Sequence, residues 1–201
     1  MSTRDRIVEE ATRQLTANGY DAFAVASVRD ALGLSSGSMF HAFPTKAALA
    51  AEVYVESMRS YQQVAVDAIA SSGEPSEAIR SWVATHLRWV EDHAEVARFL
   101  YADLPPDVAA AAREPLMDAN AVFFTAASDL FHAAAAVGLM SDLALDVAHA
   151  LVMGPPQEYC RKWTRGVTDV PPTAHIEVFC AAALAAMSAT LPVRPKKRRT
   201  P

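Results

Sequence analysis

The sequence has few of the residues and motifs on which enzymes, metal sites and disulfide frameworks depend. It contains two cysteines, Cys160 and Cys180, and their separation does not suit a metal-binding pair. A Gly-rich phosphate loop, an HExxH motif and a GxSxG motif are all absent. We therefore expect no catalytic site, no cofactor and no metal. So few cysteines are typical of the reducing cytoplasm, and a redox role for Cys160 is the weaker alternative.

Long apolar runs and strict alternation of apolar and polar residues are also scarce. The longest uncharged run, residues 178–193, is short for a membrane span and ends near a proline, so we interpret it as a buried helix. No alternation with a period of two is long enough to require a sheet. With 201 residues, of which 52% are hydrophobic, the chain is expected to be a soluble all-α protein.

Two short helices joined by a tight turn are predicted between residues 25 and 46. Val25, Val28 and Leu32 are spaced as one face of the first helix. Gly33 then breaks the pattern, at a point where the turn needs a residue that tolerates positive φ. This pattern predicts a helix-turn-helix, in which the second helix can enter a DNA major groove.

The second helix has an unusual exposed side. Ser35 and Ser36 are N-cap candidates, and apolar residues at positions 39, 40 and 43 face the first helix. The other side carries small or neutral residues: Ser36, Gly37, Ser38 and His41. Small side chains let a backbone approach DNA closely, and hydroxyls can bond bases or phosphates. A surface helical hairpin without a DNA partner is the alternative that these two helices alone leave open.

The flanking residues complete a three-helix unit. A helix is predicted over residues 3–18, with Ile7, Ala11 and Leu15 on one face and Gly19 at its end. On the other side, Thr45 is a plausible N-cap for a long helix that continues to about residue 70.

Spaced residues over about the first fifty positions resemble the DNA-binding domain of the tetracycline-repressor (TetR/AcrR) family. The residues that carry the resemblance are Ile7, Ala11, Leu15, Gly19, Tyr20, Val25, Val28, Gly33, Leu34, Ser35, Gly37, Ser38, Met39, Phe40, Phe43, Lys46 and Leu49. The resemblance implies a homodimeric transcriptional regulator, usually a repressor that leaves its operator when a small ligand fills the C-terminal domain.

Three departures from the family pattern affect the expected DNA contacts. Ala24 stands where a capping Thr is common, and Phe40 stands where a Tyr hydroxyl commonly meets phosphate. Arg29 stands where a small Ala is usual, and its cation could replace the lost phosphate affinity or remain a solvated surface charge. The expected DNA-binding residues are Arg29, Ser35, Ser36, Gly37, Ser38, Phe40, His41 and Lys46.

The net charge of −5 is unevenly distributed. Residues 1–50 carry five basic and five acidic side chains, and residues 51–190 carry eight basic and eighteen acidic ones. An acidic body repels the DNA backbone except where a specific surface is presented. This distribution argues against general nucleic-acid packaging and favours a few placed contacts that dimerisation doubles.

The last two predicted helices, over about residues 142–165 and 173–190, are expected to form a dimer interface. Residues 143–153 and 181–189 are apolar on most sides of a helix, and such helices must be covered on most sides. A partner subunit is the simplest cover in a chain of this size, and burial within one subunit is the alternative.

A ligand site is harder to locate from the sequence. The predicted helix over residues 75–93 places Ile79, Trp82, His86 and Trp89 along one side. Aromatic rings beside one titratable group could line a pocket for a hydrophobic or aromatic ligand, and an ordinary core with a satisfied histidine is the alternative. The expected ligand-binding residues are Trp82, His86, Trp89, Phe99, Phe124 and Tyr159.

The sequence thus predicts a DNA-binding domain over residues 1–46 and an effector-binding and dimerisation domain over residues 47–191. Residues 192–201 form a basic tail that we expect to be disordered. The expected partners are double-stranded operator DNA, a second copy of the chain and a small-molecule effector, with no membrane. The alternative function is a helical ligand-binding or scaffold protein that has lost DNA binding.

Overall fold

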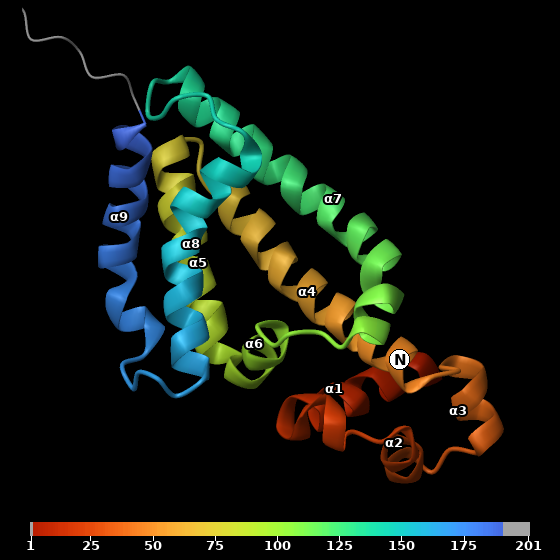
Figure 1. Cartoon of the computed structure of the whole chain (residues 1–201). Coiled ribbons are helices and arrows are strands. Elements are labelled where there is room, and N and C mark those ends of the chain that lie inside the picture. Colours follow the sequence, from red (N-terminus) through yellow and green to blue (C-terminus); the bar gives the residue numbers. More distant parts are fainter. Residues whose placement is uncertain (1, 191–201) are drawn as a thin grey trace, which may run out of the picture.

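The computed structural model describes residues 2–190, and the predicted basic tail, residues 192–201, lies outside that range. The described residues form helices and no strand, which confirms the predicted all-α class (Figure 1). The elements are α1 (Thr3–Ala22), α2 (Val25–Leu32), α3 (Ser36–Ala42), α4 (Lys46–Ala70), α5 (Pro75–Asp92), α6 (Ala94–Leu100), α7 (Pro106–Ala136), α8 (Leu145–Thr164), the 3-10 helix η1 (Pro172–His175) and α9 (Ile176–Ala189).

Local capping interactions set the bounds of the N-terminal unit, α1–α3. Ser2 and Asp5 form a capping box at the start of α1, with each side chain bonded to the backbone N–H of the other residue. Gly33 ends α2 in the left-handed conformation at φ 65°, as the sequence predicted. Ser35 caps α3 and Thr45 caps α4, and both caps match the predicted positions.

The core of the N-terminal unit extends beyond its own three helices. Ile7, Leu15 and Val28 are fully or almost fully buried together with Leu49 of α4 and Val108 of α7. Because α4 contributes its first turns to this core and its last turns to the body, one rigid helix connects the two parts (Figure 1). A tilt of α4 would therefore move the N-terminal unit.

The body, α5–α9 with the second half of α4, has a separate aromatic core. Trp82 of α5 is fully buried, with its ring centroid 5.7 Å from that of Phe123 and 6.0 Å from that of Phe131. The α4–α7 pair forms the most extensive helix–helix contact among the described residues. The predicted apolar face of residues 79–89 is therefore buried, and it anchors α5 at the centre of the body.

The outer faces of α8 and α9 remain uncovered in the single chain (Figure 1). Within α9 only Cys180, Ala183 and Met187 are buried, whereas Val178 is 63% exposed. Within a single chain, the described part of the predicted buried helix over residues 178–193 is covered on one side only, because the remaining described helices reach one side of α9. The stretch Pro172–Ala189 is long and apolar enough to cross a membrane by length and composition, and 22% of it is buried.

Candidate nucleic-acid interface and ligand cavity

Helix α3 presents a small, neutral surface on a firmly anchored base. Met39 and the following Phe43 are buried against α1, α2 and α4, so the rotation of the helix about its axis is fixed. The opposite side is exposed and consists of Ser36, Gly37, Ser38, Phe40 and His41. Phe40 is 67% exposed, so the expectation that it faces the first helix together with Met39 and Phe43 is wrong. A ring left in solvent beside hydroxyls suits contact with a partner surface.

The serines at the start of α3 bond to one another and to α2. The Oγ of Ser35 accepts a hydrogen bond from the backbone N–H of Ser38 at 3.1 Å and lies 2.9 Å from the Ser38 Oγ. The Ser36 Oγ accepts from Nη1 of Arg29 at 3.2 Å. Arg29 also forms an ion pair with Asp30 at 2.6 Å, which balances much of its charge. Arg29 thus lies beside the N-terminus of α3, where a phosphate would be attracted.

Two cations connect α1 to the helices that follow it: Arg4 at the start of α1 bonds to α3 and α4, and Lys46 of α4 bonds to the end of α1. Arg4 donates to the carbonyl oxygen of Ala42 at 3.0 Å, pairs with Glu52 at 2.9 Å and lies 4.3 Å from the centroid of the Phe43 ring. Lys46 donates to the carbonyl oxygen of Asp21 at 3.4 Å, above the ring of Tyr20. Sequence reasoning missed Arg4, because its partners are 38 and 48 positions away and only the folded chain brings them together.

A cavity of about 240 Å³ lies in the body between α4, α5, α6, α7 and α8. Three of the six predicted ligand residues, His86, Trp89 and Phe124, line it. The other lining residues are Met58, Tyr61, Gln62, Val90, Ala97, Leu100, Tyr101, Leu116, Asn120, Phe123, His149 and Gln157. The wall is therefore aromatic and apolar, with several neutral groups that can form hydrogen bonds, as is usual for small-molecule sites.

His86 is held in the cavity wall between two tyrosines. Its Nδ1 lies 2.9 Å from the Tyr61 hydroxyl, and its Nε2 lies 3.2 Å from the Tyr101 hydroxyl. Burial, with a smaller contribution from His149, lowers the pKa of His86 from 6.5 to about 3. The imidazole is therefore neutral at pH 7, so that one ring nitrogen donates to a tyrosine and the other accepts.

Gln62 of α4 is the polar residue in this wall that sequence reasoning missed. It is 6% exposed, and its Nε2 donates to Oδ1 of Asn120 on α7 at 2.5 Å. Its Oε1 is buried and accepts no hydrogen bond from any described residue. A buried amide oxygen without a donor destabilises the folded protein by about 1–3 kcal/mol. A polar group left unpaired in this way is a candidate for a functional role. A glutamine within a long helix gives no sequence signal of this role.

Two other predicted ligand residues lie outside the cavity wall. Trp82 is behind the wall, with its ring centroid 5.7 Å from those of the lining residues Phe123 and His149. Tyr159 instead contacts α9 and the segment before it: its hydroxyl donates to the carbonyl oxygen of Val170 at 2.9 Å, and its ring packs on Phe179. Helical spacing predicted that Trp82 faces the core but not which residue covers it.

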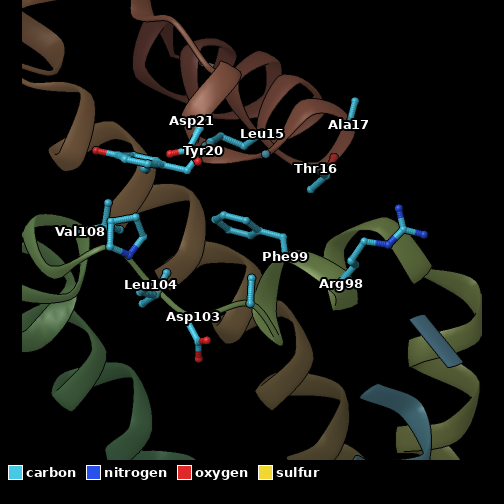
Figure 2. A pocket seen from close by; sticks show the side chains of 14 residues that line it. Leu15, Thr16, Ala17, Tyr20, Asp21, Arg98, Phe99, Asp103, Leu104 and Val108 are labelled. Atoms are coloured by element: carbon cyan, nitrogen blue, oxygen red, sulfur yellow. The ribbon is translucent and has the colours of Figure 1, made fainter. Parts of the chain in front are cut away.

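Phe99 lies in a second pocket, of about 370 Å³, between the N-terminal unit and the body. In Figure 2 its ring projects from α6 toward Leu15 and Tyr20 of α1, with Leu104 and Val108 beneath. Arg98 and Asp103 border the same space (Figure 2). This pocket joins residues of both parts of the chain and is distinct in its lining from the aromatic cavity in the body.

The two cysteines are buried and unlinked. Burial raises the pKa of the Cys160 thiol to about 12, and burial also raises the pKa of Cys180. Because both pKa values are raised, few of these thiols ionise to the reactive thiolate, and the structure does not support a redox role for either cysteine. Residues 2–190 contain no group of three His, Cys, Asp or Glu side chains placed to hold a metal ion.

Comparison with known proteins agrees with the geometry of the N-terminal unit. Residues 7–53 match the family described as bacterial regulatory proteins, tetR family, which confirms the predicted resemblance. No curated protein sequence matches the chain. Its fold is similar to that of solved structures that share little sequence with it, and these matches span almost the whole of both chains.

Three of these structures illustrate the range of structural similarity and sequence identity. The regulator FadR of Bacillus subtilis, solved with stearoyl-CoA, has a TM-score of 0.75 at 13% identity, covering 90% of this chain and 98% of its own. The tetR-family regulator PfmR of Thermus thermophilus has a TM-score of 0.68 at 20% identity, with coverages of 90% and 98%. The ketosteroid regulator KstR2 of Mycobacterium tuberculosis has a TM-score of 0.63 at 19% identity, with coverages of 92% and 95%.

Proposed function

We propose that this chain is a homodimeric repressor that binds operator DNA, because residues 7–53 match the tetR family of bacterial regulatory proteins. A small hydrophobic or aromatic effector in the body releases it. The observation that carries this proposal is the exposed face of α3, on which small hydroxyl side chains and one aromatic ring stand on a buried base. The same two-part plan recurs in structural relatives that are named regulators.

The DNA contacts divide by chemistry. Ser36, Ser38, Phe40 and His41 lie on the exposed face of α3, where a helix in the major groove meets base edges. Ser35 acts as the N-cap and orients the helix, and Gly37 leaves the backbone open to close approach. Arg29 and Lys46 flank this helix and supply phosphate contacts once DNA competes for their present partners.

Dimerisation uses the uncovered faces of α8 and α9. Val147 of α8 and Val178 of α9 are exposed, and the alanines at positions 181, 182 and 185 of α9 are exposed as well. Small side chains let helices of two subunits approach closely, and burial of this apolar face offsets the cost of association. A two-fold axis through this face would present two copies of α3 to one palindromic site.

Helix α4 connects effector and DNA. Its N-terminal end carries Lys46 and Glu52, which bond to residues of α1, and its later turns supply Met58, Tyr61 and Gln62 to the cavity wall. An effector that fits one tilt of α4 better than another shifts the population of α3 spacings. The released state is the one in which the two α3 helices no longer match successive half-sites.

The test is selection of bound duplexes from a random DNA pool with purified protein at moderate salt. Recovery of one palindromic motif is expected. The salt dependence of binding to that motif should then be steep, because each phosphate contact releases counterions. A folded dimer that recovers no motif would refute sequence-specific DNA binding.

Such a failure would favour the second candidate, a helical ligand-binding or scaffold protein. Two observations favour that candidate: Ala24, at the N-cap position of α2, provides no side-chain cap, and the Arg29 cation is already paired with Asp30. Under this alternative, DNA binding is weak and without sequence preference, whereas the cavity still binds its ligand.

A further inference from the structure

The cavity in the body has a chemical character that restricts its ligand. None of its fifteen lining residues is Lys, Arg, Asp or Glu. Burial lowers the pKa of both lining histidines, His86 to about 3 and His149 in the same direction. A carboxylate, phosphate or ammonium group would therefore lose its hydration here without gaining a counter-charge.

Gln62, which lines this cavity, carries one hydrogen-bond acceptor that no described residue matches. The Asn120 carbonyl takes one N–H of the Gln62 side chain, which fixes the amide plane between α4 and α7. The Oε1 atom is left buried with no donor among the described residues. A ligand that donates an N–H or O–H to this atom removes the cost of an unsatisfied buried acceptor.

The remaining wall favours a ring. Trp89, Phe123 and Phe124 are part of it, and Phe124 is partly exposed at 44%. The cavity volume of about 240 Å³ lies below the range of about 300–1,000 Å³ that is usual for drug-sized ligands. One substituted aromatic ring, rather than a long chain or a fused multi-ring skeleton, therefore suits the space.

We propose that this cavity binds small, uncharged aromatic compounds that donate an N–H or O–H hydrogen bond to Oε1 of Gln62. Gln62 is then the residue that selects donor-bearing ligands from apolar ligands of the same shape. The proposal deepens the proposed function, because it names the effector class of the same site. It also differs from what binds the structural relative FadR, which was solved with stearoyl-CoA, a large acyl thioester.

The test uses three para-substituted benzenes of similar size with the full chain at pH 7.5. 4-Ethylphenol has a donor, 4-ethyltoluene replaces the hydroxyl with a methyl group, and 4-ethylbenzoate has a negative charge. Isothermal titration calorimetry should give 4-ethylphenol about twofold to tenfold tighter binding than 4-ethyltoluene, as one net hydrogen bond provides. 4-Ethylbenzoate should bind at least about tenfold more weakly than 4-ethylphenol, because its charge finds no partner.

The variant Gln62→Leu isolates the selecting residue. It replaces the amide with an apolar side chain of similar volume, so 4-ethyltoluene should still bind and thereby show that the cavity is intact. The preference for 4-ethylphenol should disappear. Gln63→Leu, on the exposed neighbouring position of α4, is the matched control and should keep the wild-type preference.

Three results would overturn the proposal. The first is equal affinity of the wild type for 4-ethylphenol and 4-ethyltoluene. The second is an unchanged preference for 4-ethylphenol in Gln62→Leu. The third is that folded protein binds none of the three probes. Because none of these measurements involves DNA, failure of the proposal is distinguishable from failure of DNA binding in the duplex selection.

Discussion

The neutral state of His86 should make the stability of this protein depend on pH. The histidine has a pKa near 6.5 in the unfolded chain and about 3 in the folded one, because burial disfavours the imidazolium ion. Between these two values the unfolded chain binds a proton that the folded chain does not. The contribution of His86 to stability is therefore fully present above pH 6.5 and is lost progressively as the pH falls toward 3.

The magnitude follows from the same two values. Each pH unit between them is worth about 1.4 kcal/mol, so acidification from pH 7.5 to pH 5 should lower the free energy of unfolding by about 2 kcal/mol through this residue alone. His149, whose pKa burial also lowers, adds a loss in the same direction. The free energy of unfolding of a domain is about 5–15 kcal/mol. A loss of about 2 kcal/mol is a large part of that total, so urea denaturation can measure it.

The assay is urea unfolding at several pH values between 5 and 7.5 for the wild type and two variants. His86→Gln removes the titrating group but retains an amide that can bond to Tyr61 or Tyr101. Its stability at pH 7.5 should be lower, and the drop toward pH 5 should be smaller than in the wild type by about 2 kcal/mol. His132→Gln, at an exposed position of α7, is the control and should follow the wild-type profile. Equal pH dependence in the wild type and His86→Gln would refute the reasoning.

Three further predictions concern the N-terminal unit and the dimer. Ser35→Ala should lower the free energy of unfolding by about 1 kcal/mol and weaken operator binding, because α3 loses its N-cap. Urea denaturation checks the loss of stability against Ser36→Ala, which keeps the cap, and gel-shift titration checks the loss of operator binding against the wild type. Lys46→Met should reduce the slope of log K against log salt for operator binding by about 1, and an unchanged slope would exclude a phosphate contact by this side chain. Ala182→Glu should convert the dimer to a monomer in sedimentation experiments, since a charge would enter the apolar face of α9, whereas Ala109→Glu on exposed α7 should remain dimeric.

The helices of this protein could be predicted from the sequence because the signals that bound them are local. Gly33 at positive φ and the caps at Ser35 and Thr45 each act within one turn, and all three are found where the sequence predicted them. Gly19, which was predicted to end the first helix, interrupts it at φ 76°, and a short further helical segment after this kink carries α1 to Ala22.

The cavity was predicted only in part, because its wall is assembled from five helices. The periodicity of α5 indicates that Trp82, His86 and Trp89 share a face, but it cannot say that Trp82 is covered by Phe123. Phe99 and Tyr159 are aromatic residues on partly buried faces, as a ligand residue would be, yet they face other spaces. Aromatic composition alone does not distinguish core, pocket and junction.

The sequence by itself determined the all-α class, the helix-turn-helix and the resemblance of the N-terminal residues to the tetR family, since these depend on patterns repeated within a few turns of helix. Only the tertiary structure decided which polar groups lie together in the body. The unmatched oxygen of Gln62 and the enclosed imidazole of His86 depend on contacts between residues that are 15 to 58 positions apart in the sequence. Burial and hydrogen-bond satisfaction belong to the packed arrangement of helices, so no local pattern encodes them.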